Sequence, residues 1–118
     1  MYHCGTAPVL MHIGADMYSA MIVDPKEGWA PAQELILIQS EFYVQPDDDG
    51  SGVMIPDVGK LFSGGMLEYV TFNGYVHQYV EPPLKVKAGE LVRIFMVNCG
   101  PTSGRRSMWS GRSSTRCI

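Results

Sequence analysis

Short runs of apolar and β-branched residues, separated by turns, recur along the first hundred positions of the chain. Two runs are long enough for full strands, at 34–44 (ELILIQSEFYV) and 91–98 (LVRIFMVN). Shorter apolar or β-forming runs stand at 17–23, 69–72, 75–80 and 84–87. This pattern predicts an all-β protein.

Turn-forming residues separate these runs. The pair Asn73-Gly74 suits a type I′ turn and predicts a hairpin made by 69–72 and 75–80. A polar stretch at 45–52 (QPDDDGSG) predicts a second turn. Short strands at this spacing are typical of a sandwich or a Greek-key barrel.

Three further segments complete the predicted organisation. The chain opens on MYHC, which resembles the end of a strand, and residues 25–33 (PKEGWAPAQ) have the Pro and Gly content of a linker. One short helix is predicted at 57–66, within a stretch that is rich in glycine.

Composition narrows the possible functions. The 118 residues are 46% hydrophobic and 18% charged, as in a globular protein, and carry a net charge of −3. This acidic balance gives no reason to expect nucleic-acid binding. No apolar run reaches the roughly 18 residues of a membrane-spanning helix, and the N-terminus lacks a basic region followed by an apolar one. We therefore expect neither a membrane segment nor an export signal. Three widely spaced cysteines, at 4, 99 and 117, do not form a disulfide framework.

The candidate chemistry lies in the stretch YHCGTAPVLMHIGADM, where Cys4, His12 and Met17 follow one another at short intervals. A blue-copper site needs a thiolate, two imidazoles and a weak axial thioether. Taken singly, the three residues are more readily a buried thiol, a turn residue and a core residue. Their ordered combination instead favours three of the four ligands of a copper site.

Other candidates are weaker. The Asp-rich stretch at 45–56 matches part of a calcium-loop pattern but lacks the terminal carboxylates, so a turn is predicted there. His77 has no partner at a metal-binding spacing and is predicted to be structural or solvent-facing. Cys99 ends an apolar strand and is predicted to be a small core residue.

The ligand stretch resembles the copper-ligand loop of copper-containing nitrite reductases, which are built from two cupredoxin domains. In that family the Cys, the next His and the Met bind the type 1 copper, so the resemblance implies this role for Cys4, His12 and Met17. The His before the Cys binds the type 2 copper, where nitrite is reduced, which implies the same for His3.

The resemblance extends over residues 1–102 and implies an incomplete cupredoxin-like Greek-key fold. Residues 1–24, ending in MIVD, resemble the last strands of the first domain, and 25–33 the linker. Residues 34–102 resemble the first half of the second domain, from ELILIQSEFY to VRIFMVNCGP. No catalytic residue outside the copper ligands is implied.

The adjacency of His3 and Cys4 has a physical consequence. Successive side chains of a strand face opposite sides, so neighbouring residues can hold two metals on opposite faces. The resemblance implies that an electron crosses this bridge from type 1 to type 2 copper, where nitrite becomes nitric oxide. It also implies a periplasmic homotrimer that is reduced by a small cupredoxin or a cytochrome.

Two rival readings remain open. One is a multicopper oxidase of another kind, but laccase-like enzymes carry His-Cys-His, whereas Gly5 follows Cys4 here. A simple electron carrier, in turn, would not need His3. A copper-binding or electron-transfer fragment without catalysis is the other rival, because the remaining ligands of both sites belong outside the chain.

The loop departs from the family at the residue before the axial ligand. The family commonly has Asn-Gly-Met there, whereas this chain has Ala15-Asp16-Met17. If the replaced glycine has a positive φ, Asp is one of the better tolerated substitutes. We therefore expect the loop to keep its shape.

Residues 103–118 are predicted to be a disordered frameshift product. The family continues with an apolar strand resembling FHVVGAIFDTVY, whereas this chain turns to Ser, Arg and Gly. Suitable synonymous codons for that strand, read one base late, encode SMWSGRSSTRC, which matches Ser107 to Cys117. Sequencing the encoding DNA tests this prediction, which is wrong if the shifted frame does not encode a cupredoxin strand.

Overall fold

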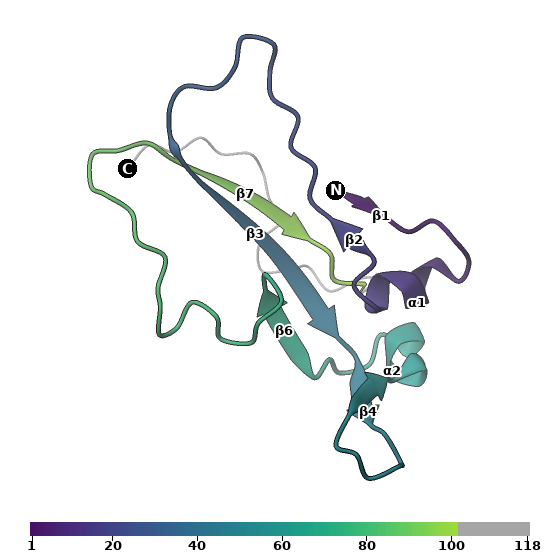
Figure 1. Cartoon of the computed structure of the whole chain (residues 1–118). Coiled ribbons are helices and arrows are strands. Elements are labelled where there is room, and N and C mark those ends of the chain that lie inside the picture. Colours follow the sequence, from purple (N-terminus) through teal and green to yellow (C-terminus); the bar gives the residue numbers. More distant parts are fainter. Residues whose placement is uncertain (102–118) are drawn as a thin grey trace.

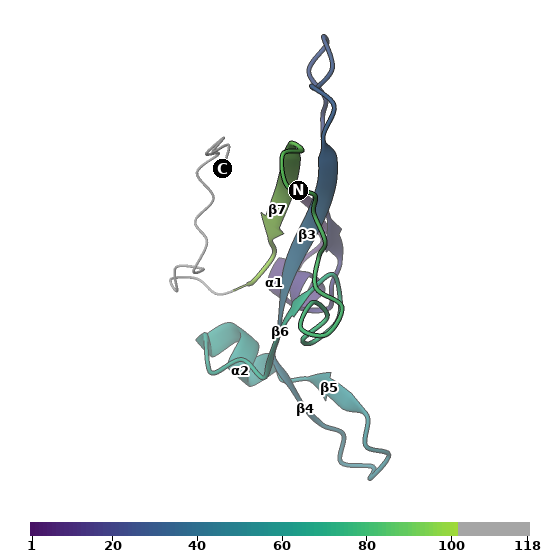
Figure 2. The same cartoon turned by 90° about the vertical axis from the view of Figure 1, so that its left-hand side faces the viewer.

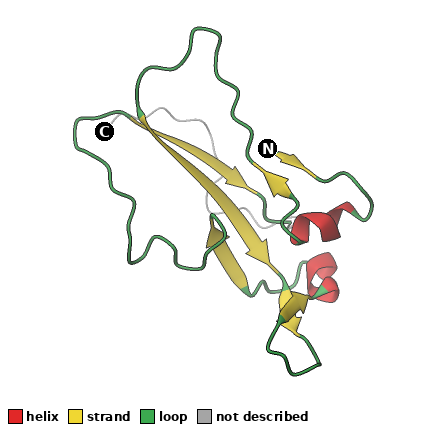
Figure 3. Ribbon diagram, viewed as in Figure 1, coloured by secondary structure: helices red, strands yellow, loops and turns green. Residues whose placement is uncertain are grey.

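The computed structural model describes residues 1–101. Its elements, in chain order, are β1 (Tyr2–His3), α1 (Val9–Gly14), β2 (Tyr18–Ser19), β3 (Gln33–Phe42), β4 (Val44–Pro46), β5 (Met54–Pro56), α2 (Val58–Ser63), β6 (Tyr69–Phe72) and β7 (Val92–Asn98). Strands outnumber helices in this part of the chain (Figure 3), which confirms the predicted β class. The predicted frameshift product lies outside the described residues.

The largest sheet has three strands in the order β6-β3-β7 (Figure 1). β3 pairs antiparallel with β6 and parallel with β7, and its first seven residues all align with β7. The ten residues of β3 match most of the predicted strand 34–44, because its β-branched and aromatic side chains suit a pleated, half-buried surface.

Two further sheets have only two strands each, β1 with β2 and β4 with β5. All their pairings are antiparallel and two or three residues long. Seen from the side in Figure 2, β4 and β5 project away from β3 and β7. The described strands therefore do not close into a barrel, in agreement with the prediction of an incomplete fold.

The predicted linker contains neither helix nor strand between Ser19 and Gln33, and it is attached to the largest sheet through Trp29. The Arg93 guanidinium lies 4.6 Å from the centroid of the Trp29 ring, which also meets Phe95 edge-on at 6.5 Å. The indole N–H donates to Asp24 at 2.9 Å. One aromatic side chain thus fixes the linker to β7.

Little of the described chain is fully buried. Its buried apolar residues are Tyr43, Leu61 and Cys99, whereas Ile94 on β7 is 56% exposed. The radius of gyration is 17.0 Å, compared with about 13 Å for a compact domain of about 100 residues. The fold therefore relies on strand pairing and local contacts more than on one shared core.

The predicted hairpin forms only in part. Asn73 and Gly74 have φ values of 53° and 88°, and positive φ at both positions is what a type I′ turn requires. After the turn, an isolated bridge joins Phe72 and Tyr75. The predicted strand 75–80 is wrong, because His77 takes a φ of 57° and the chain coils into further turns.

Two other predicted strands differ from the structure. Residues 84–87 are irregular, and they follow Pro82 and Pro83, which have no N–H to donate to a sheet. Within the run 17–23 only Tyr18–Ser19 is a strand, because β1 offers only two residues to pair with. No helix among the described residues is long and apolar enough to cross a membrane.

The predicted helix at 57–66 is confirmed as α2, which is shorter than expected. Asp57 is its N-cap, and the carboxylate accepts from the Lys60 N–H at 2.9 Å. Gly64 ends the helix with a left-handed φ of 65°. An acidic cap and a terminal glycine are the usual helix boundary signals.

We predict that Asp57→Ala lowers the free energy of unfolding by about 1 kcal/mol, the usual cost of losing a side-chain cap. Asp57→Asn should restore most of the loss, because an amide oxygen also caps. Urea unfolding followed by circular dichroism measures both variants. Asp48→Ala, an exposed change in the β4–β5 turn, is the control, and an equal loss there would contradict the assignment.

Candidate metal centre

The predicted ligand loop is closed by pairing between its two ends. β1 and β2 are antiparallel, with His3 opposite Tyr18. The next main-chain bond runs from the Cys4 N–H to the Met17 carbonyl, at 2.9 Å. The loop between them therefore returns to its starting point, and Cys4 and Met17 become neighbours although thirteen positions separate them.

The second predicted ligand faces the first. His12 lies in the last turn of α1, a helix that was not predicted from the sequence, and its Nδ1 is 3.3 Å from the Cys4 Sγ. Metal–sulfur and metal–imidazole bonds are about 2.3 and 2.0 Å long, as known for zinc. Two donor atoms 3.3 Å apart can therefore bind one ion.

Met17 is placed beside this pair by its main chain. Its N–H donates to the His12 carbonyl at 3.0 Å, and its carbonyl accepts from Cys4. The Met17 side chain is 49% exposed, so burial in a core does not account for this methionine. The loop thus brings together a thiol and an imidazole, with the backbone of a methionine beside them. Thiolate, imidazole and thioether are ligand types that suit copper.

His3 is oriented by the main chain of Cys4 and not by the other predicted ligand side chains. Its Nδ1 donates to the Cys4 carbonyl at 2.8 Å, while the side chain is exposed. Because a carbonyl can only accept, Nδ1 carries the proton in this bond, and the neutral ring then has its lone pair on Nε2. Ligating histidines usually make this kind of hydrogen bond through their other ring nitrogen. His3 is therefore oriented as a free imidazole donor.

Asp16 takes the strained conformation that the sequence suggested. Its φ is 62°, in the left-handed region that glycine favours and that Asp tolerates. Its carboxylate accepts from the Tyr18 hydroxyl. Burial and this hydrogen bond to Asp16 raise the pKa of Tyr18, whereas a hydrogen bond with Ser40 opposes the rise. Tyr18 was not identified from the sequence.

α1 is supported from the second half of the chain. A Cβ atom on Gly14 would lie 2.9 Å from a methyl carbon of Leu61, a buried residue of α2. The helix that carries His12 therefore packs on α2 at a position where only glycine fits without a shift. The local sequence does not reveal this requirement, because the contact joins residues far apart in the chain.

The weaker candidates show no metal chemistry. The Asp-rich stretch is a turn, in which Asp49 accepts from the Ser51 N–H at 2.8 Å. Cys99 is buried, as predicted, and burial raises the pKa of its thiol. Across residues 1–101, no group of three or more His, Cys, Asp and Glu side chains is placed to hold a metal ion.

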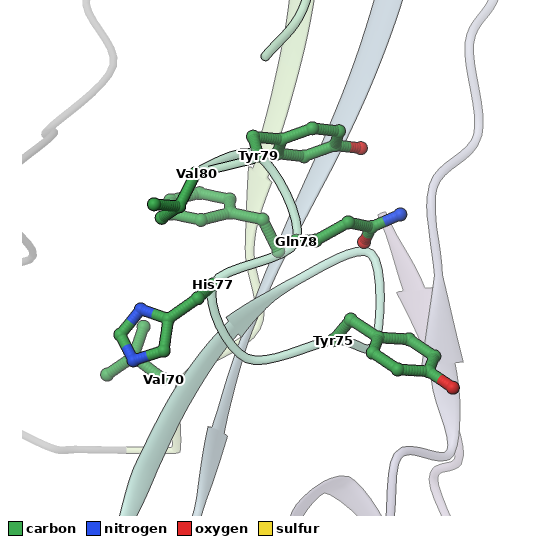
Figure 4. Close-up of a pocket in the computed structure, with 7 residues that line it drawn as sticks. Val70, Tyr75, His77, Gln78, Tyr79 and Val80 are labelled. Atoms are coloured by element: carbon green, nitrogen blue, oxygen red, sulfur yellow. The ribbon is translucent and has the colours of Figure 1, made fainter. Parts of the chain in front are cut away.

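His77 is exposed, as predicted, and borders an open recess of about 370 Å³. Figure 4 shows His77 on the opposite side of this loop from Tyr75, and Gln78 and Tyr79 follow His77 in the chain. The recess is formed by one segment around β6 and holds no second histidine, so it is unsuited to a metal.

The sequence of the chain is similar to that of known proteins. No family model matches the chain. It is 40% identical over 103 residues to proteins named copper-containing nitrite reductase from Neisseria meningitidis serogroups A and B and from Neisseria gonorrhoeae.

The matched region is 86% of this chain and 26% of each of these relatives. The chain thus spans about a quarter of their length, and its similarity is to one segment of a larger protein. Over most of its own length, the chain is a homologue of copper-containing nitrite reductases.

Proposed function

We propose that Cys4, His12 and Met17 contribute to a type 1 copper site of a copper-dependent nitrite reductase. The observation that carries the proposal is the approach of the Cys4 Sγ to the His12 Nδ1, at 3.3 Å, beside the backbone of Met17. A soft thiolate, an imidazole and a thioether together select copper over hard cations. The name shared by the relatives points to the same metal.

We assign His3 to a type 2 copper. The hydrogen bond from its Nδ1 to the Cys4 carbonyl leaves Nε2 available as a ligand. His3 and Cys4 are adjacent, so one stretch of main chain connects the two donor atoms. The carbonyl that orients His3 belongs to Cys4 itself, which adds a second connection by hydrogen bond.

Copper supplies one-electron redox chemistry when bound. Reduction of nitrite to nitric oxide requires one electron and two protons, and it releases water. The electron arrives on the side of Cys4, whose thiol is a ligand of the type 1 copper. It leaves on the side of His3, whose imidazole is a ligand of the copper where nitrite is reduced. The electron donor is a small cupredoxin or cytochrome. The whole protein is a periplasmic homotrimer that acts in denitrification.

A second candidate function is copper binding or electron transfer without catalysis. One observation favours it for this chain by itself: the described residues bring the Cys4 thiol and the His12 imidazole together, whereas His3 contacts only the main chain of Cys4. A catalytic metal needs several protein ligands together with an open position for substrate. A different multicopper oxidase is less favoured, because Gly5 has no side chain to serve as the second histidine.

We predict that this chain, given Cu(II), develops no intense visible thiolate-to-copper band and does not consume nitrite. Three donors do not complete a type 1 site, and one imidazole does not complete a type 2 site. Absorption spectroscopy and a nitrite assay with an excess of chemical reductant measure both outcomes. A strong band that disappears in Cys4→Ser would contradict the prediction, because it would require a fourth ligand from this chain.

In a complete protein that contains this segment, we predict opposite effects for the two neighbouring ligands. His3→Ala should abolish nitrite turnover but keep the visible colour, whereas Cys4→Ser should remove the colour. His77→Ala is the control and should change neither property, since His77 lies in a separate exposed turn. Intact turnover in His3→Ala would show that His3 is not a type 2 ligand.

A further inference from the structure

The residues on either side of Met17 are joined by their side chains. The Tyr18 hydroxyl donates to the Asp16 carboxylate. Their main chains are joined as well, because the Tyr18 N–H donates to the Asp16 carbonyl at 2.9 Å. Met17 is therefore the middle residue of a three-residue turn closed by two hydrogen bonds.

This turn is strained at Asp16, whose φ is 62°. A left-handed conformation at a residue other than glycine costs about 1 kcal/mol and persists only where neighbouring contacts hold it. The contacts here are the Tyr18 hydroxyl and the bond from the Asp16 N–H to the Ile13 carbonyl, at 3.0 Å. The second of these ties the turn to the end of α1.

Tyr18 is the fixed member of the pair. It belongs to β2, pairs with His3 of β1, and is half-buried, whereas Asp16 is exposed. The main chain of β1 continues from His3 into Cys4, whose N–H donates to the Met17 carbonyl. A restraint on Asp16 that passes through Tyr18 therefore ties the turn to the pairing of β1 with β2.

We propose that Asp16 and Tyr18 are positioning residues, which form a clamp that fixes the Met17 thioether for copper. This inference rests on the proposed function, in which Cys4, His12 and Met17 are ligands. Loss of the clamp leaves Cys4 and His12 facing each other, because their contact involves neither residue. It frees Met17 to leave the site, so the clamp acts on the metal through one ligand only.

The test uses Cu(I), a soft ion, bound anaerobically by the full chain in competition with a chromophoric chelator. Tyr18→Phe removes only the hydroxyl, and Asp16→Gly removes the carboxylate while suiting the left-handed φ. Each change should weaken Cu(I) binding by about two- to tenfold, the contribution of an ordinary hydrogen bond. Tyr75→Phe, in an exposed turn, is the matched control and should have no effect.

Combining the variants separates the clamp from a general effect on stability. Tyr18→Phe and Asp16→Gly break the same bond, so the double variant should bind Cu(I) no more weakly than either single variant. In a Met17→Leu background neither change should alter Cu(I) binding, because the ligand that they position is gone. Non-additivity of this kind is the mark of groups that act as a unit.

The outcomes distinguish this inference from the proposed function. Cu(I) uptake that is unchanged by Cys4→Ser would overturn both, because the thiol would not be a ligand. Uptake that depends on Cys4 and Met17 but not on Tyr18 would overturn the clamp alone. An equal effect of Tyr18→Phe with and without Met17 would also overturn it, because the hydroxyl would then act on the fold as a whole.

A second measurement needs no metal. In the chain labelled with ¹³C at the methionine methyl groups, the Met17 signal is identified by its absence from Met17→Leu. Tyr18→Phe should shift and sharpen that signal as the side chain gains freedom, while Tyr75→Phe leaves it in place. An unchanged Met17 signal in Tyr18→Phe would mean that the hydroxyl does not fix this side chain.

Discussion

The pairing of β3 with strands on both of its sides holds the described structure together. Along this one strand, Gln33 to Gln39 align with β7 and Gln39 to Phe42 align with β6. β3 also provides Glu34, which forms an ion pair with Arg93 of β7. β6 and β7 are therefore held in one sheet by this element, and the linker is attached to that sheet through β7.

The candidate metal centre depends on closure of a short loop at the edge of that framework. The bond from the Cys4 N–H to the Met17 carbonyl joins its ends, and α1 presents His12 from within. Such closure is largely local, so its entropic cost is small. The packing of Gly14 against Leu61 then links the loop to α2. The donor atoms are thus fixed by a few defined contacts and not by deep burial.

The largest sheet has an apolar face that is partly exposed to solvent in this structure. Ile94 is paired in register with Leu35, and Met96 with Leu37, so one face of β3 and β7 is apolar. Ile94 and Met96 are 56% and 37% exposed in this structure. Apolar burial is the main favourable contribution to folding, at about 25 cal/mol for each Å². Strand hydrogen bonds and the Trp29 contacts therefore provide much of the order in this part of the chain.

Features that depend on near neighbours were predictable from the sequence. The run of β-formers in 34–44 gives β3, and Asn73-Gly74 gives a turn with positive φ. Asp57 and Gly64 mark the ends of α2. The left-handed Asp16 followed from comparing this residue with the glycine it replaces. The types and order of the four candidate ligands are likewise a property of the sequence alone.

Features that depend on distant partners were decided by the tertiary structure. Residues 75–80 have strand-like composition, yet they find no partner strand and coil instead. His12 faces Cys4 because α1 forms and packs on α2, and a local pattern does not encode that contact. The bond between Tyr18 and Asp16 needs a turn whose shape strand pairing fixes. Residue type sets which bonds are possible, whereas spatial proximity sets which of them form.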